Sequence, residues 1–160
     1  LTLVEAQAEI QRIRHQPLHY SRRVIIVAVG MGCAAFCRLF GGDVTAVVTT
    51  LIAASIAMFT RQELHKHHLN PLLIVMLTAF TAGVIAGIGA TWRVSERPQA
   101  ALAASVLLLV PGVPLVNAAG DLLKGYIFTG TMRGVYGALI SFCIALGLLL
   151  AMALTGVTDV

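Results

Sequence analysis

The sequence predicts an all-α membrane protein: five transmembrane helices, of which the fourth is broken by prolines, preceded by a short amphipathic helix. The first observation is composition, because 58% of the 160 residues are hydrophobic, 11% are charged and the mean hydropathy is +0.90. A soluble domain of this length cannot bury that much apolar surface. The second is that apolar stretches of about membrane length alternate with short polar connections. The third is that no stretch alternates as a strand does, and helices satisfy their own backbone hydrogen bonds in lipid.

Residues 2–16 have the pattern of an amphipathic helix with a basic surface. Thr2 and Glu5 form the capping-box pattern T-x-x-E, and Pro17 ends the run. This helix lies on the membrane surface, packs on an upstream domain, or is a plain linker. We expect residues 1–22 to be this helix and its linker, at the end of a longer upstream segment, and residues 23–160 to be the transmembrane domain.

Five apolar segments follow as the expected spans. They are Val24–Phe40, Val44–Thr60, Pro71–Trp92, Ala100 to about Ala119, and Gly134 to about Thr155. Small residues within them predict close helix packing, including the G-x-x-x-G pairs Gly83/Gly87 and Gly130/Gly134 and the set Gly30, Gly32, Ala34 and Ala35. An odd number of spans with its ends on opposite sides suits one half of an inverted pair of repeats.

The basic residues indicate how the chain is oriented. With a cytoplasmic N-terminus, eight of the eleven lie on the inner side, against three outside (Arg38, Arg93 and Arg97). Cytoplasmic loops carry the excess of Lys and Arg. We therefore expect a multi-pass protein of the inner (plasma) membrane with its N-terminus in the cytoplasm. The net charge of +4 is explained by these flanks and does not indicate nucleic acid.

The stretch "PGVPLVNAAGD" is the main candidate site. Pro111, Gly112 and Pro114 should unwind about one turn of the fourth span, freeing carbonyls before the break and amides after it. Broken membrane helices place such groups around substrates and ions. Asn117 follows just after the break, and Asp121 lies one turn later on the same face. The alternative is a proline kink that only shapes packing.

The stretch "CRLFGGD" predicts a sharp corner after the first span. Gly41 and Gly42 join Arg38 to Asp43, which is placed to cap the next helix. One interpretation is a tight hairpin with a surface ion pair. The other is that Arg38 faces a substrate carboxylate, for which its planar guanidinium is suited.

Other polar residues give weaker signals. His65, His67 and His68 lie among basic residues, so we expect a solvated loop and no metal site. We expect inert, buried thiols at Cys33, Cys37 and Cys143. The hydroxyl groups of the second span either line a wet path or bond back to their own helix; they belong to Thr45, Thr49, Thr50 and Ser55.

Three motifs together resemble the threonine/serine exporter family: "CRLFGGD", "PGVPLVNAAGDLLKG" and "TMRG", in that order. The resemblance covers nearly the whole chain. It implies an inner-membrane exporter of small carboxylate-bearing metabolites, which are threonine and serine in some members and succinate in a split, two-subunit form. The chain is similar to the membrane portion of the larger subunit of that split form. A separate, smaller membrane subunit would then be its partner in a hetero-oligomer.

These observations lead to the hypothesis of a secondary exporter subunit that is not an enzyme and has no cofactor. The substrate carboxylate would meet the amides after Pro114 beside Asn117, with Arg38 as a further charge and Asp121 as a proton relay. The sequence contains no G-x-x-x-x-G-K-[ST] motif, which favours proton or potential coupling. We favour dicarboxylates over amino acids because of the split form and the basic excess.

Two alternatives belong to other classes of protein. One is a non-transporting subunit that only assembles a partner. The other is an intramembrane aspartyl protease with Asp43 and Asp121 as its dyad, although Phe40 stands where that motif needs its first glycine.

Overall fold

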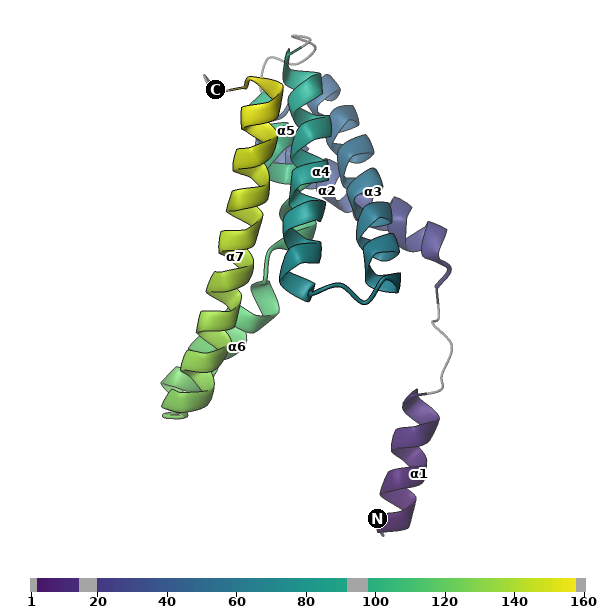
Figure 1. The fold of residues 1–160 in the computed structure, drawn as a ribbon, viewed down its shortest axis with the longest axis vertical. Helices are drawn as coiled ribbons and strands as arrows, with labels where there is room; N and C mark the ends of the chain where they lie inside the picture. Colours follow the sequence, from purple (N-terminus) through teal and green to yellow (C-terminus); the bar gives the residue numbers. More distant parts are fainter. Residues whose placement is uncertain (1–2, 15–19, 92–97, 158–160) are drawn as a thin grey trace.

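The computed structural model describes residues 3–14, 20–91 and 98–157, and the regular structure in these ranges is helical. Figure 1 shows the helices in chain order. They are α1 (Leu3–Arg14), α2 (Arg22–Leu39), α3 (Val44–Lys66), α4 (Pro71–Thr91), α5 (Pro98–Ser105), the 3₁₀ turn η1 (Leu107–Leu109), α6 (Gly112–Leu123) and α7 (Ile127–Thr155). Thr2, on which the capping-box prediction depends, lies outside the described residues, as do Arg93 and Arg97.

The described helices support three to four membrane spans rather than the five expected. By length and composition α3, α4 and α7 can each cross a bilayer. The bent pair Gln99–Leu109 and Gly112–Leu123, which turns by 66°, makes a fourth if it counts as one span. The first expected span is a helix, α2, but its 18 residues include Arg22, Arg23 and Arg38. By the same measure of length and composition α2 is not counted among the spans, so the five expected spans are not confirmed.

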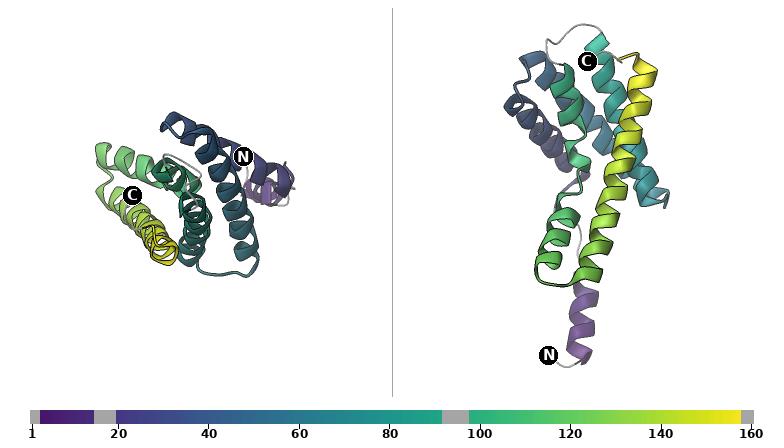
Figure 2. Two further views of the ribbon diagram at one scale, coloured as in Figure 1. Left: turned by 90° about the horizontal axis from the view of Figure 1, so that it is seen from above. Right: turned by 90° about the vertical axis from the view of Figure 1, so that its left-hand side faces the viewer.

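The centre of the bundle is the packing of α4 against α7, which lie side by side in Figures 1 and 2. Glycines permit this contact. A Cβ atom on Gly83 would lie 2.7 Å from the Ala151 Cβ, and one on Gly147 would lie 2.4 Å from the Met76 carbonyl oxygen. The close packing predicted for Gly83 and Gly87 is therefore confirmed. The other face of α4 packs on α3, which in turn packs on α2.

The small-residue face predicted for the first span is only partly a packing surface. Gly30 contacts α3, because a Cβ there would lie 2.2 Å from the Ser55 Oγ, and Ala34 is buried. Ala35 is exposed, and a Cβ on Gly32 would meet nothing within 4 Å. Helical periodicity explains the division, since residues 30 and 34 lie on one face and residues 32 and 35 lie outside it.

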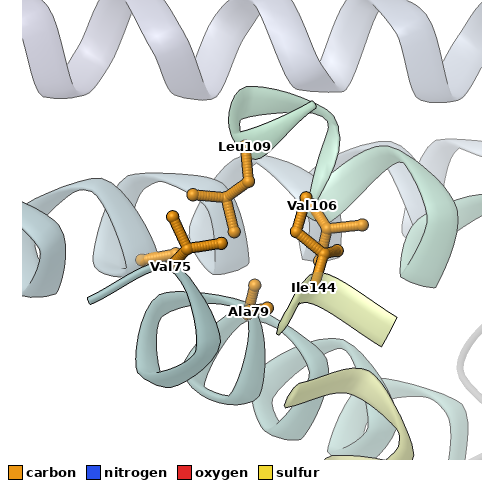
Figure 3. Packing of buried hydrophobic residues seen from close by; sticks show 7 residues of the cluster. Val75, Ala79, Val106, Leu109 and Ile144 are labelled. Atoms are coloured by element: carbon orange, nitrogen blue, oxygen red, sulfur yellow. The ribbon is translucent and has the colours of Figure 1, made fainter. Parts of the chain in front are cut away.

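Figure 3 shows how the turn η1 is anchored in the core. Val106, which directly precedes the turn, and Leu109, its last residue, are 6% and 5% exposed. They pack with Val75 and Ala79 of α4 and with Ile144 of α7. The interruption between α5 and α6 is thus held in place by apolar contacts on both sides.

Below this core, α6 and the first half of α7 form a helical hairpin that extends beyond the connection between α3 and α4 (Figures 1 and 2). The two helices meet at a tight turn in which Gly125 has a φ of +83°, a conformation that favours glycine. The last span was expected to begin at Gly134, but α7 begins at Ile127 and has 29 residues. At 1.5 Å per residue it is about 43 Å long, more than the hydrocarbon core requires.

Candidate functional site

The interruption of the fourth span begins before the position that the prolines predicted and ends at Pro111. The α-helix already ends at Ser105, η1 follows, and α6 begins at Gly112 with Pro111 as its N-cap. A residue before proline is disfavoured in the helical region, and Val110 is extended, with a ψ of 123°. Pro114, by contrast, lies in the first turn of α6, where a missing N–H breaks no helical hydrogen bond. Pro111 therefore bounds the break, and Pro114 belongs to the helix that follows it.

This geometry corrects the predicted anion site after Pro114. The Leu115 amide donates to the Pro111 carbonyl at 3.1 Å, so the first amide after Pro114 is not free. The groups released by the break lie before Pro111. The Leu108 carbonyl accepts a hydrogen bond from Arg61 Nη1 of α3 at 3.5 Å, which is near the outer limit for such a bond.

Asn117 lies in an open groove between α6 and α7, which we call the hairpin groove. Its volume is about 390 Å³, and its lining residues are Val113, Pro114, Asn117, Met132, Arg133 and Tyr136. The Asn117 carboxamide can both donate and accept hydrogen bonds. Asn117 and Arg133 bring donors for a carboxylate to an otherwise largely apolar groove.

Asp121, one turn after Asn117, pairs with Arg133 across the hairpin. The distance from Arg133 Nη1 to Asp121 Oδ2 is 2.5 Å, and the two side chains are 49% and 19% exposed. The sequence places Arg133, the arginine of the "TMRG" motif, only among the basic residues that flank the spans. The missed signal was the tight turn at Gly125, which folds α7 back along α6 and brings residues 121 and 133 together.

The corner between α2 and α3 is a glycine helix cap. Gly41 has a φ of +79°, its amide donates to the Arg38 carbonyl at 3.1 Å, and the Gly42 amide donates to the Cys37 carbonyl at 2.9 Å. These are the two bonds of a Schellman motif. Arg38 Nη1 donates to the Gly42 carbonyl at 3.0 Å, which holds the side chain at its own corner.

The structure does not bring this corner to the α6 residues. Asp43 occupies the N-cap position of α3, as predicted, but its side chain makes no capping hydrogen bond to the helix amides. Its carboxylate accepts a hydrogen bond from the Thr45 hydroxyl. The start of α3 and the helix α6 lie at opposite ends of the molecule in Figure 1. Arg38 is therefore remote from Asn117, and Asp43 and Asp121 do not form the dyad that an aspartyl protease would need.

The weaker polar signals have structural explanations. The hydroxyls of Thr49 and Thr50 donate to the carbonyls four residues earlier, at 2.9 and 2.8 Å, so they bond back to their own helix. Cys33 and Cys37 are buried free thiols, and Cys143 is half-buried. His65 lies in the last turn of α3 and His67 is its C-cap. Within the described ranges no three metal-binding side chains come together.

Comparison with known proteins gives the family. A sequence model of the family described as "Putative threonine/serine exporter" matches residues 1–155. The chain belongs to this threonine/serine exporter family. The resemblance of the three motifs is therefore confirmed.

Two relatives with similar sequences carry the name "Probable succinate transporter subunit YjjP". The Escherichia coli (strain K12) protein is 42% identical over 142 residues, which are 88% of this chain and 56% of the relative. The Klebsiella aerogenes protein is 40% identical over 142 residues, 88% of this chain and 55% of the relative. This chain thus spans about half the length of the relatives it matches. No solved structure matches it.

Proposed function

We propose that this chain is one subunit of a secondary exporter that moves small carboxylate-bearing metabolites out of the cell through the inner membrane. Succinate or another dicarboxylate is the favoured substrate class, and threonine or serine is the other. The family supports a role in transport, and the word "subunit" in the names of the two relatives supports assembly with another chain. We infer that this partner is a smaller membrane subunit of the same family. We also infer that this chain takes part in transport and does not only assemble the partner.

The observation that carries the proposal is the hairpin groove. Asn117 and Arg133 both line it, and Asp121 forms a salt bridge with the Arg133 guanidinium. A guanidinium has five N–H donors, so Arg133 can contact a substrate carboxylate while it keeps its bond to Asp121. The helix α6 that presents Asn117 begins at the anchored break, which fixes its position in the bundle.

Orientation and coupling belong to the same proposal. Gln62 Nε2 is 3.5 Å from the Arg22 carbonyl, so the start of α2 lies beside the basic end of α3, with Arg61 and Lys66. A common basic end supports a cytoplasmic location for it, and with it a cytoplasmic N-terminus. We propose proton or potential coupling, with Asp121 as the relay carboxyl and no enzymatic step.

The test is uptake into inverted membrane vesicles that carry the full-length protein with and without its presumed partner. Labelled succinate and labelled threonine are compared under an imposed proton gradient. We expect succinate uptake only when both subunits are present, and loss of uptake for Asn117→Ala. Gln62→Ala, an amide-to-methyl change outside the groove, is the matched control and should keep wild-type uptake.

Three other outcomes would change the proposal. Threonine uptake in place of succinate would keep the exporter and change its substrate class. Equal uptake for wild type and Asn117→Ala would remove the hairpin groove as the site. Uptake by the partner alone, unaffected by any substitution in this chain, would leave the role of a non-transporting assembly subunit.

A further inference from the structure

A second cavity lies on the other side of the break, between α2, α3 and η1. We call it the break cavity. Its volume is about 300 Å³, and its lining residues are Val29, Gly32, Cys33, Phe36, Met58, Arg61, Leu107 and Leu108. Among these residues of the described chain, Arg61 alone carries a charge. None of them belongs to the hairpin groove, so the two sites are distinct.

The described residues around Arg61 offer its guanidinium few hydrogen-bond acceptors. The half-buried guanidinium has five donors, and its hydrogen bond is the long one, 3.5 Å, to the Leu108 carbonyl. The walls contributed by Val29, Phe36 and Met58 offer no polar atom to it. A cation in apolar surroundings is costly unless an anion or several acceptors face it.

The break explains why Leu108 can face Arg61. In a continuous helix the Leu108 carbonyl would accept from the amide of residue 112. Instead the Gly112 amide donates to the Val110 carbonyl at 2.8 Å, and the Leu108 carbonyl turns to α3. Val106 and Leu109 hold the turn in the core, so the carbonyl stays beside the cavity.

We propose that the break cavity binds a substrate carboxylate through Arg61, as a loading site apart from the hairpin groove. This inference rests on the proposed export of carboxylates. The planar guanidinium accepts two carboxylate oxygens in parallel, which is a stronger arrangement than one long bond to a neutral carbonyl. With the basic end of α3 in the cytoplasm, the cavity faces the side from which an exported substrate enters.

Gly32 supplies a reporter inside the cavity. A Cβ atom on Gly32 would meet nothing within 4 Å, so Gly32→Cys places a thiol in open space without disturbing the helix packing. The experiment uses the full-length protein with its partner in membrane vesicles, with the native cysteines replaced by alanine. The rate of thiol modification is measured with an anionic and a cationic methanethiosulfonate reagent, with and without succinate or threonine.

We expect the anionic reagent to react faster than the cationic one, and substrate to slow both. Arg61→Gln should abolish the charge preference and the protection by substrate, because no other described residue that lines the cavity is charged. It should also lower transport by roughly tenfold or more, since charge-assisted bonds are about twice as strong as neutral ones. Arg61→Lys should keep the charge preference but weaken protection. Lys66→Gln is the matched control: it removes the same charge from the same helix, but Lys66 pairs with Glu63 outside the cavity.

The outcomes separate this site from the proposed function. If the wild type transports a carboxylate and Arg61→Gln transports equally well without any change in protection, the loading site is refuted and the export function stands. That result would mean that the Arg61 side chain snorkels, with its charged end at the membrane surface and no substrate bound to it. If no carboxylate is transported, yet one protects Gly32→Cys only when Arg61 is present, the binding site stands and the export function fails. If neither transport nor protection occurs, both are refuted.

Discussion

The packing of α4 on α7 predicts opposite effects for one substitution at two glycines. At Gly147 an added methyl would lie 2.4 Å from the Met76 carbonyl oxygen, 2.8 Å from the Ala79 Cβ and 3.0 Å from the Phe80 amide nitrogen. Backbone atoms cannot move aside as a flexible side chain can, so the helices must separate. Overpacking of this kind costs up to about 3 kcal/mol. Alanine recovers about 1 kcal/mol through its better helix propensity, which leaves a net loss of about 2 kcal/mol.

Gly120→Ala is the matched control. Gly120 lies within α6, and a Cβ there would meet nothing within 4 Å. Only the propensity term applies, so this variant should gain about 1 kcal/mol. For a chain of this size, 1 kcal/mol corresponds to about 2–4 °C in Tm. We therefore expect Gly147→Ala to lower Tm by about 4–8 °C and Gly120→Ala to raise it by about 2–4 °C.

The assay is thermal unfolding of the purified protein in detergent, followed with a dye that becomes fluorescent on reacting with thiols. Cys33 and Cys37 are buried, so they become reactive when the helices come apart. An unchanged or higher Tm for Gly147→Ala would show that α4 and α7 do not meet at this glycine, and the arrangement of the bundle would have to be revised.

Three further predictions concern the hairpin and the break. Asp121→Asn should flatten the pH dependence of vesicle transport if this carboxyl relays protons, and an unchanged pH profile would exclude the relay. Arg133→Gln should abolish transport but change Tm by less than about 4 °C, because a half-exposed ion pair contributes at most about 1 kcal/mol; a large loss of Tm would indicate a structural role instead. Pro111→Ala should release the restraint that keeps Val110 extended and so reduce transport, whereas Pro114→Ala should leave transport and Tm nearly unchanged, since Pro114 lies in the first turn of α6. Equal effects of the two on transport and Tm would contradict the position of the break.

Much of the architecture could be predicted from local chemistry. Apolar length predicted the start of α3 and both ends of α4, because a bilayer sets the length of a span. It did not predict the end of α3, which continues beyond Thr60 through polar residues to Lys66, where a solvated loop was expected. The glycine corner was predictable too, since Gly41 provides the left-handed conformation that a helix cap needs. The close packing at Gly83 followed from the rule that links small residues to close helix approach, but that rule did not identify α7 as the partner helix.

The errors arose where the outcome depends on contacts distant in sequence. The prolines alone placed the break at 111–114, but α5 already ends at Ser105, and the turn that follows packs through Val106 and Leu109 against α4 and α7. The pair of Asp121 with Arg133 depends on how the hairpin turns at Gly125. The contact of Arg61 with Leu108 joins residues 47 positions apart, which no local pattern reveals.

The most direct test of the central claim is solute counterflow in liposomes that contain only the purified full-length protein and its partner subunit. The liposomes are loaded with unlabelled succinate, threonine or serine, and the uptake of a trace of the same labelled compound is followed. The account predicts transient accumulation of labelled succinate in liposomes that contain both subunits, and none for Asn117→Ala. It is contradicted if none of the three compounds accumulates above the level of protein-free liposomes while both subunits remain folded and assembled.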